Sequence, residues 1–116
     1  MRREELYLRD IVDASDAIQR FVEEVDEQDF IVDEMRQSAV LQKLMIIGEA
    51  VARISESFRK QYPEIPWTDI VGFRNIVVHE YFSIDWSIVW TTATDDVPEL
   101  QQQITSILDS DYGNQE

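Results

Sequence analysis

Apolar residues recur at steps of three and four along most of the chain, which is the spacing of one face of an α-helix. The first such stripe predicts a helix over residues 4–25, and the second predicts a long helix over 33–60. The first stripe comprises Leu8, Ile11, Val12, Ser15, Ile18, Val22 and Val25. The second comprises Val40, Leu41, Leu44, Ile47, Gly48, Val51, Ile54 and Phe58. An acidic loop at residues 26–29 is predicted between them.

The middle of the second predicted helix is apolar on nearly every side. Residues 44–47 are Leu-Met-Ile-Ile, a run that is not expected in a helix with one solvent-exposed face. This run indicates burial on two sides, by the rest of a bundle and by a second subunit.

Prolines divide the second half of the chain. Pro63 and Pro66 end the long helix and precede a third, predicted over 67–81. A fourth helix follows the turn at 83–85, where Ser83 or Asp85 could cap it, and Pro98 is expected to kink or divide it. The tail from Asp109 is expected to fray. With three Gly and three Pro, too few for a turn-rich β protein, the chain is predicted to be one all-α domain over 1–116, an antiparallel bundle of four to five helices.

The charge balance is strongly acidic. Ten Lys and Arg face 24 Asp and Glu, so the net charge is −14, which argues against broad attraction to nucleic acid or to an anionic membrane. A small local cationic site remains compatible with it. All ten Lys and Arg residues lie at or before Arg74, so residues 75–116 contain eight acidic residues and none of these cations. That stretch is either a solvated acidic surface or a face for a basic partner.

Composition narrows the chemistry further. The chain has no Cys, which excludes disulfides, Cys-ligated zinc and thiol catalysis, and a single His excludes a multi-histidine metal site within one chain. We therefore expect neither a metal nor a cofactor. No apolar run approaches the ~18 residues that span a bilayer, and no apolar signal segment follows Met1. A soluble, cytoplasmic protein without membrane contact is expected.

Candidate chemistry concentrates in residues 74–81, where a permanent cation, the one imidazole and a phenol lie close in sequence. On an ideal helix Arg74 and Tyr81 point within about 20° of each other, whereas Arg74 and His79 diverge by about 140°. Convergence of Arg74 and His79 on one ligand therefore requires a long Arg side chain reaching round, a distorted helix or a second subunit.

An imidazole and a guanidinium together suit the cleavage of RNA by its own 2′-hydroxyl. His79 would take or give a proton, and Arg74 would stabilise the charge on the phosphorane. Asn75 could orient His79 or hold the RNA backbone. The alternative on spacing alone is structural: a His that caps a helix end, an Arg paired with a carboxylate and a core Tyr.

The segment Pro66–Phe82 resembles the signature of the HepT-like proteins of the HEPN superfamily. Their pattern of Arg, four residues, His, one residue and Tyr is matched by Arg74, His79 and Tyr81. Ile47-Gly48-Glu49-Ala50 is also similar to the family's sequence, and the resemblance extends over about residues 4–108. It implies a HEPN-like all-α fold and a homodimer whose two motifs line one cleft.

The resemblance further implies a metal-independent ribonuclease that acts as the toxin of a two-gene, type VII-like toxin–antitoxin module. Arg74 and His79 would be catalytic, with Asn75 in support. Glu49 on the second predicted helix either faces the cleft and orients Arg74 or His79, or is an ordinary helix carboxylate. The partner would be an antitoxin of the minimal nucleotidyltransferase (MNT) type, which transfers AMP from ATP to Tyr81 and binds in a hetero-oligomer. Two other interpretations remain: a non-enzymatic helical partner and AMP acceptor of a nucleotidyltransferase, and a nucleotide-sensing helical domain.

Overall fold

A computed structural model describes residues 3–113, and every regular element within that range is helical. Four of the helices have 13 residues or more: α1 (Arg3–Val22), α3 (Glu34–Arg53), α5 (Trp67–His79) and α7 (Val97–Tyr112). Short elements join them: α2 (Glu27–Phe30), α4 (Glu56–Gln61), the 3-10 turn η1 (Tyr81–Ser83), α6 (Trp86–Thr91) and the π-helical segment η2 (Thr92–Asp96). The predicted all-α bundle is confirmed.

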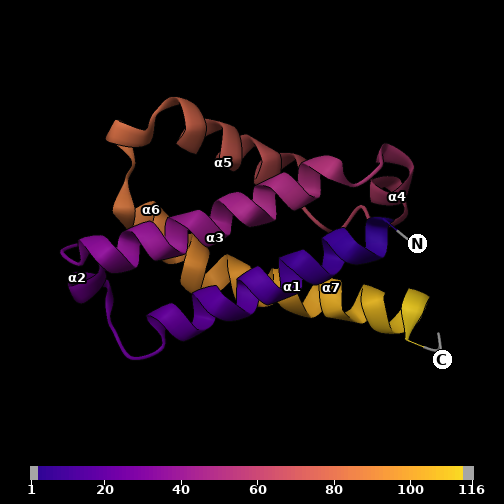
Figure 1. The fold of residues 1–116 in the computed structure, drawn as a ribbon, viewed down its shortest axis with the longest axis horizontal. Helices are drawn as coiled ribbons and strands as arrows, with labels where there is room; N and C mark the ends of the chain where they lie inside the picture. Colours follow the sequence, from indigo (N-terminus) through magenta and orange to yellow (C-terminus); the bar gives the residue numbers. More distant parts are fainter. Residues whose placement is uncertain (1–2, 114–116) are drawn as a thin grey trace.

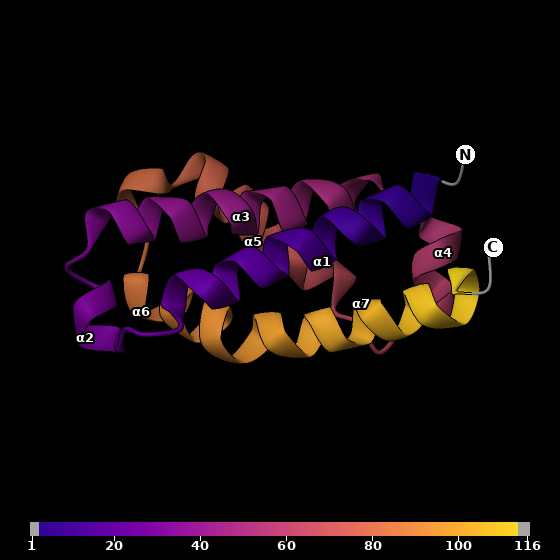
Figure 2. The same ribbon diagram turned by 60° about the horizontal axis from the view of Figure 1, so that its bottom comes forward.

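Helix α3 lies at the centre of the arrangement (Figure 1). Helix α1 packs along one side of α3 and also contacts α7, whereas α5 runs antiparallel to α3 along its other side (Figures 1 and 2). Both apolar stripes face inward, and the side chains that are fully enclosed include Leu8, Ile11, Ile18, Val40, Val51 and Ile104. This burial is the main stabilising term for helices that would be marginal alone.

The predicted helix over 33–60 is wrong in its last part, because the chain breaks at Ile54. That residue adopts an extended backbone and ends α3, and Ser55 begins α4 by accepting a hydrogen bond from the amide of Phe58 at 3.2 Å. A serine side chain competes well for the free amides at a helix start, so one polar residue divides the stripe. Ile54 and Phe58 remain buried on both sides of the break.

Two other boundaries differ from the predicted ones. Helix α1 ends at Val22 rather than at residue 25, and the predicted acidic loop contains α2, where Asp26 caps the helix by accepting from the amide of Asp29 at 2.8 Å. Asp33 caps α3 in the same way, accepting from the amide of Arg36 at 3.0 Å. That backbone hydrogen bond and the guanidinium of Arg36 hold the pKa of Asp33 below its usual value.

Pro98 divides the last helix, as predicted. Proline has no amide hydrogen to donate to the preceding turn, and the chain widens into η2 just before it. The amide of Val97 bonds the carbonyl of Thr92, five residues back, and α7 then starts with Pro98 in its first turn.

The prediction that the tail frays from Asp109 is wrong, because α7 continues to Tyr112. On this last turn Asp111 accepts a hydrogen bond from the phenol of Tyr62 at 2.6 Å. A contact with the segment after α4 therefore accompanies the extra helical turn. Residues 114–116 lie outside the described range.

Helices α3 and α5 come close together at a glycine. A Cβ placed on Gly48 would lie 2.5 Å from Cβ and 2.6 Å from Cγ of Arg74, so only a residue without a side chain leaves room for Arg74 there. A Cβ placed on Gly72, two positions before Arg74 on α5, would meet nothing within 4 Å. Gly48 is therefore required by the close packing of the two helices, whereas Gly72 has open space beside it and is not required by packing.

We expect Gly48→Ala to destabilise the fold by about 1–3 kcal/mol, because the added methyl group must push α5 away from α3. Gly72→Ala, in the same pair of helices, should instead stabilise it by about 0.5–1 kcal/mol, because alanine favours the helix and meets no neighbour. Urea unfolding of both variants measures the difference. Equal effects of the two substitutions would contradict the close approach at Gly48.

Candidate functional site

Arg74 lies in the middle of α5 with its side chain against α3. The stem of this side chain crosses Gly48, and the guanidinium Nη1 donates to the carboxylate of Glu49, the next residue on α3. The Arg74 side chain is 22% exposed and that of Glu49 is 49% exposed, so this ion pair is at the surface with one face open to water. Of the two residues that Glu49 was expected to orient, Arg74 or His79, it contacts Arg74.

His79 is the last residue of α5 and is exposed. Five helical positions separate it from Arg74, which turns the two side chains about 140° apart on this regular helix. The described part of the chain contains no hydrogen bond or ion pair between them. Asn75 is exposed one turn before His79. The structure thus keeps the imidazole reachable and leaves Arg74 and His79 of one chain pointing in different directions.

Tyr81 lies just beyond the helix, because α5 ends at His79 and not at residue 81 as predicted. Glu80 leaves helical geometry, with φ −131°, and η1 starts at Tyr81. The near-alignment of Arg74 and Tyr81 on an ideal helix therefore does not apply as such. Tyr81 nevertheless returns to the α3 side, where it lines a hollow with Val77 and Val78, and its side chain is 48% exposed.

The end of the molecule that carries Tyr81 is unusually apolar for a surface. Phe82 is 99% exposed, and Val78 and Ile76 on α5 are more than half exposed. Helix α3 begins at the same end of the bundle where α5 ends (Figure 1). Val32, just before α3, and Met35, in its first turn, are also exposed. Large apolar side chains that are exposed at one end of a folded protein indicate an interaction surface.

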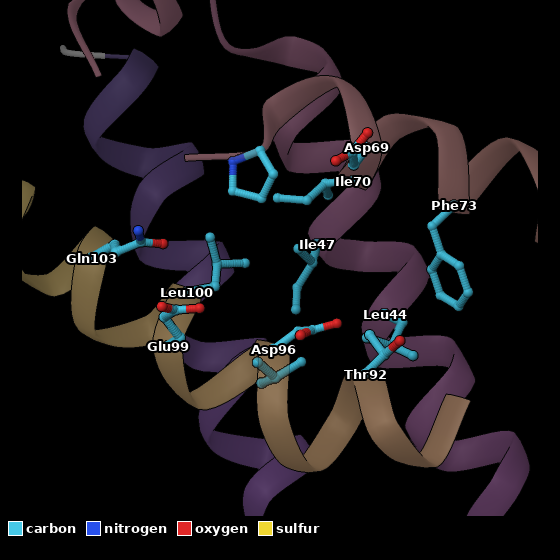
Figure 3. A pocket seen from close by; sticks show the side chains of 12 residues that line it. Leu44, Ile47, Asp69, Ile70, Phe73, Thr92, Asp96, Glu99, Leu100 and Gln103 are labelled. Carbon is cyan, nitrogen blue, oxygen red and sulfur yellow. The ribbon is translucent and has the colours of Figure 1, made fainter. Parts of the chain in front are cut away.

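A second hollow, of about 340 Å³, lies on the side of α5 that faces η2 and α7 (Figure 3). Its interior is apolar, with Leu44, Ile70, Phe73 and Leu100 among its walls. The carboxylates of Asp69, Asp96 and Glu99 also line it. Burial, together with the negative charges of Asp95 and Glu99, raises the pKa of Asp96 above its usual value. This hollow contains neither Arg74 nor His79.

Two other kinds of feature are absent from residues 3–113. No three His, Asp or Glu side chains there gather in a way that could hold a metal ion. None of the helices in that range combines the length and apolar character needed to cross a bilayer.

Comparison with known proteins identifies the class to which this fold and motif belong. The family model described as Ribonuclease HepT-like matches residues 11–107. A protein of Thermococcus cleftensis named "Probable ribonuclease HepT" is 39% identical over 95 residues, covering 82% of this chain and 86% of its own. A protein of Methanocaldococcus jannaschii, named as a candidate RNase, is 37% identical over 98 residues, covering 84% and 90% respectively. No solved structure matches with significance.

The chain belongs to the Ribonuclease HepT-like family. The resemblance inferred from the Arg74–His79–Tyr81 pattern is thereby confirmed, whereas the roles of these residues stay predictions. One feature of the site was not recognised in the sequence: Gly48 is required by the packing of Arg74. The signal for it was the Ile47-Gly48-Glu49-Ala50 segment, since a glycine inside a long helix disfavours the helix and needs a packing reason.

The raised pKa of Asp96 has a consequence for stability. Because the folded state disfavours the ionised form, the stability associated with this group is present below pH 3.8, its unperturbed pKa, and is lost as the pH rises through the raised pKa. Asp96→Asn should therefore raise the melting temperature at pH 7, and the gain should vanish at pH 3. Asp10→Asn, an exposed change of the same charge on α1, is the control. Equal gains for both substitutions at pH 7 would show that net charge alone is responsible.

Proposed function

We propose that this protein is a ribonuclease toxin whose catalytic residues are Arg74 and His79. The observation that carries the proposal is the placement of the two side chains. Arg74 is held against α3 with its side chain 22% exposed, and His79 stands exposed at the end of the same helix. The names of the relatives in Thermococcus cleftensis and Methanocaldococcus jannaschii refer to ribonucleases, which supports the same class of reaction.

In this reaction the RNA supplies its own nucleophile. Neutral His79 accepts the proton of a 2′-hydroxyl, the 2′-oxygen bonds to the adjacent phosphorus, and the bond from phosphorus to the 5′-oxygen breaks. The leaving 5′-oxygen takes a proton from an imidazolium or from water, so the products carry a 2′,3′-cyclic phosphate and a 5′-hydroxyl. Arg74 binds the phosphate and stabilises the charge on the phosphorane, while Glu49 positions its guanidinium. Asn75 supports His79 or the RNA backbone.

A homodimer would bring an Arg74 and a His79 side chain together at one site, which a single helix does not do. Arg74 and His79 of one chain diverge by about 140°, so a complete site takes Arg74 from one chain and His79 from the other. The exposed apolar surface around Val78 and Phe82, which flanks His79 in sequence, supports a contact between copies at this end of the bundle. A dimer there would pair each His79 with the Arg74 of the other copy across a shared cleft.

Single-residue variants test the catalytic assignment. His79→Ala should lower the rate of RNA cleavage by about 10²–10⁴-fold, because proton transfer is lost. Arg74→Ala should lower it by about 10²–10³-fold through loss of charge stabilisation. Cleavage is measured on labelled single-stranded RNA with protein purified in parallel from cells that lack the partner.

Arg20→Ala is the matched control, since Arg20 is a surface cation on α1 paired with Asp16 at 3.4 Å. It should cleave at the wild-type rate. Cleavage that persists unchanged in both His79→Ala and Arg74→Ala would assign the activity to other residues or to a contaminant.

A second candidate function is that of an AMP acceptor for a nucleotidyltransferase partner of the MNT type, with or without ribonuclease activity. It is favoured by Tyr81, which is half exposed on the α3 side of the chain, the side that Arg74 also faces. The phenol oxygen would attack the α-phosphorus of ATP, release pyrophosphate and lose its proton to water or a base. The added phosphate and nucleoside would block the cleft by charge and by bulk. In this arrangement the two proteins form a toxin–antitoxin pair in a hetero-oligomer.

Incubation with such a partner and ATP should add AMP to Tyr81, and Tyr81→Phe should abolish the addition. Tyr62 is a poor acceptor, because its hydrogen bond to Asp111 and its partial burial raise its pKa to about 12. Intact mass followed by peptide mapping measures the adduct and its position. AMP found on Tyr7, Tyr62 or Tyr112 alone, or no adduct at all, would refute this function.

A further inference from the structure

A hollow of about 300 Å³ lies between α3 and the end of α5, apart from the carboxylate-lined one in Figure 3. We call it the α3–α5 hollow. Its lining residues are Ser38, Leu41, Gln42, Met45, Val77, Val78 and Tyr81. On α3 these residues are spaced by three, one and three, which places them all on the one face that α5 leaves partly open. No cation or carboxylate belongs to this lining.

The composition of the α3–α5 hollow suits a flat aromatic ligand. Leu41, Met45, Val77 and Val78 supply apolar walls, and Tyr81 supplies the one aromatic ring. Bases of single-stranded RNA are recognised in this manner, by stacking on an aromatic side chain and by hydrogen bonds along the base edge.

Two side chains can make those edge hydrogen bonds. Ser38 and Gln42 are one helical turn apart on α3 and both are exposed at the hollow. Neither has a side-chain hydrogen bond to any residue in the described range, so their donors and acceptors are free for a ligand. A glutamine amide donates and accepts at the same time, which matches the adjacent N6 donor and N7 acceptor of adenine.

The α3–α5 hollow opens on the same seam as the proposed phosphate-binding Arg74. Val78 lies one turn after Arg74 on α5, and Glu49, which holds Arg74, lies seven residues after Gln42 on α3. Seven helical residues span about 10 Å, a length comparable to one nucleotide from base to phosphate. A nucleotide that places its phosphate at Arg74 can therefore place a base over Gln42.

We propose that the α3–α5 hollow is a base-recognition pocket for the RNA substrate, with adenine as the preferred base and Gln42 as the residue that determines the preference. Tyr81 stacks on the base, and Ser38 adds a hydrogen bond at the base edge. This inference rests on the proposed ribonuclease function, and it adds a sequence preference that Arg74 and His79 cannot provide. Arg74 contacts a phosphate, which is the same in every nucleotide.

The test is the base profile of bound RNA. His79→Ala protein, which should bind without cleaving, is mixed with a pool of random-sequence RNA, and the bound molecules are sequenced. We expect adenine to be enriched about tenfold at one position. Gln42→Leu in the same background keeps the size of the side chain and should remove the enrichment. Gln61→Leu, at an exposed glutamine of α4 outside the hollow, should leave it unchanged.

A second variant separates stacking from edge recognition. Tyr81→Ala should weaken binding of every sequence about tenfold, because stacking tolerates any base, while the profile of the RNA that still binds keeps adenine in excess. If the His79→Ala protein shows the same base profile with and without Gln42→Leu, the proposal is overturned. A failure of the His79→Ala protein to bind RNA at all would also overturn it.

Cleavage by the wild-type protein distinguishes this inference from the function on which it rests. Cleavage at positions without any base preference would support the proposed ribonuclease function and contradict the proposed base-recognition pocket. Suppose instead that the His79→Ala protein binds adenine-containing RNA selectively but the wild-type protein does not cleave RNA. This result would support the base-recognition pocket and contradict the ribonuclease function.

Discussion

The candidate site depends on one steric constraint, the close approach of α3 and α5 at Gly48. Because no side chain separates the two helices there, the stem of Arg74 lies directly on α3 and its guanidinium meets Glu49. A long, flexible cation is thereby held in one direction on an otherwise acidic protein. Its burial is incomplete, and this leaves part of its hydrogen-bonding capacity for an anion. A phosphate bound there would meet a pre-positioned group rather than a mobile one, which lowers the entropy lost on binding.

The same constraint explains why Arg74 and His79 of a single chain do not converge. Fixing Arg74 toward α3 also fixes the regular helix that follows, and His79 then points about 140° away. The apolar surface at that end of the bundle, which includes Val78 and the almost fully exposed Phe82, is the feature that would bring a second copy into register. A dimer cleft would also reconcile the proposed RNA binding with a net charge of −14, since two guanidinium groups would be concentrated at one place.

Most of the helices could be predicted from the spacing of apolar residues and the positions of the prolines. The stripes through Ile18 and Val51, the proline break before α5 and the division at Pro98 are all observed, because each follows from a local rule of helix geometry. The break at Ile54 does not follow from periodicity: the apolar stripe continues across it to Phe58, and the serine cap that interrupts the helix leaves the period intact. The ordered last turn of α7 carries a contact between Tyr62 and Asp111, 49 residues apart, which no local pattern contains.

Within the candidate site, the sequence indicated the candidate residues but not how their side chains are oriented. The pairing of Arg74 with Glu49 and the passage of its stem over Gly48 join segments about 25 residues apart, so they required the packed structure. The position of Tyr81 depends on where α5 ends. A few weak hydrogen bonds determine where a helix ends, and the helix propensities of the residues do not predict such an end accurately.

The most direct measurement of the central claim is the activity of a mixed dimer. Arg74→Ala and His79→Ala chains, each inactive alone, are unfolded together and refolded so that the copies exchange, and RNA cleavage is then measured. If each site combines Arg74 of one chain with His79 of the other, every mixed dimer contains one intact site and cleaves at about half of the wild-type rate per dimer. If both residues act from the same chain, no mixed dimer contains an intact site, and cleavage that stays at the level of the separate variants would contradict the account.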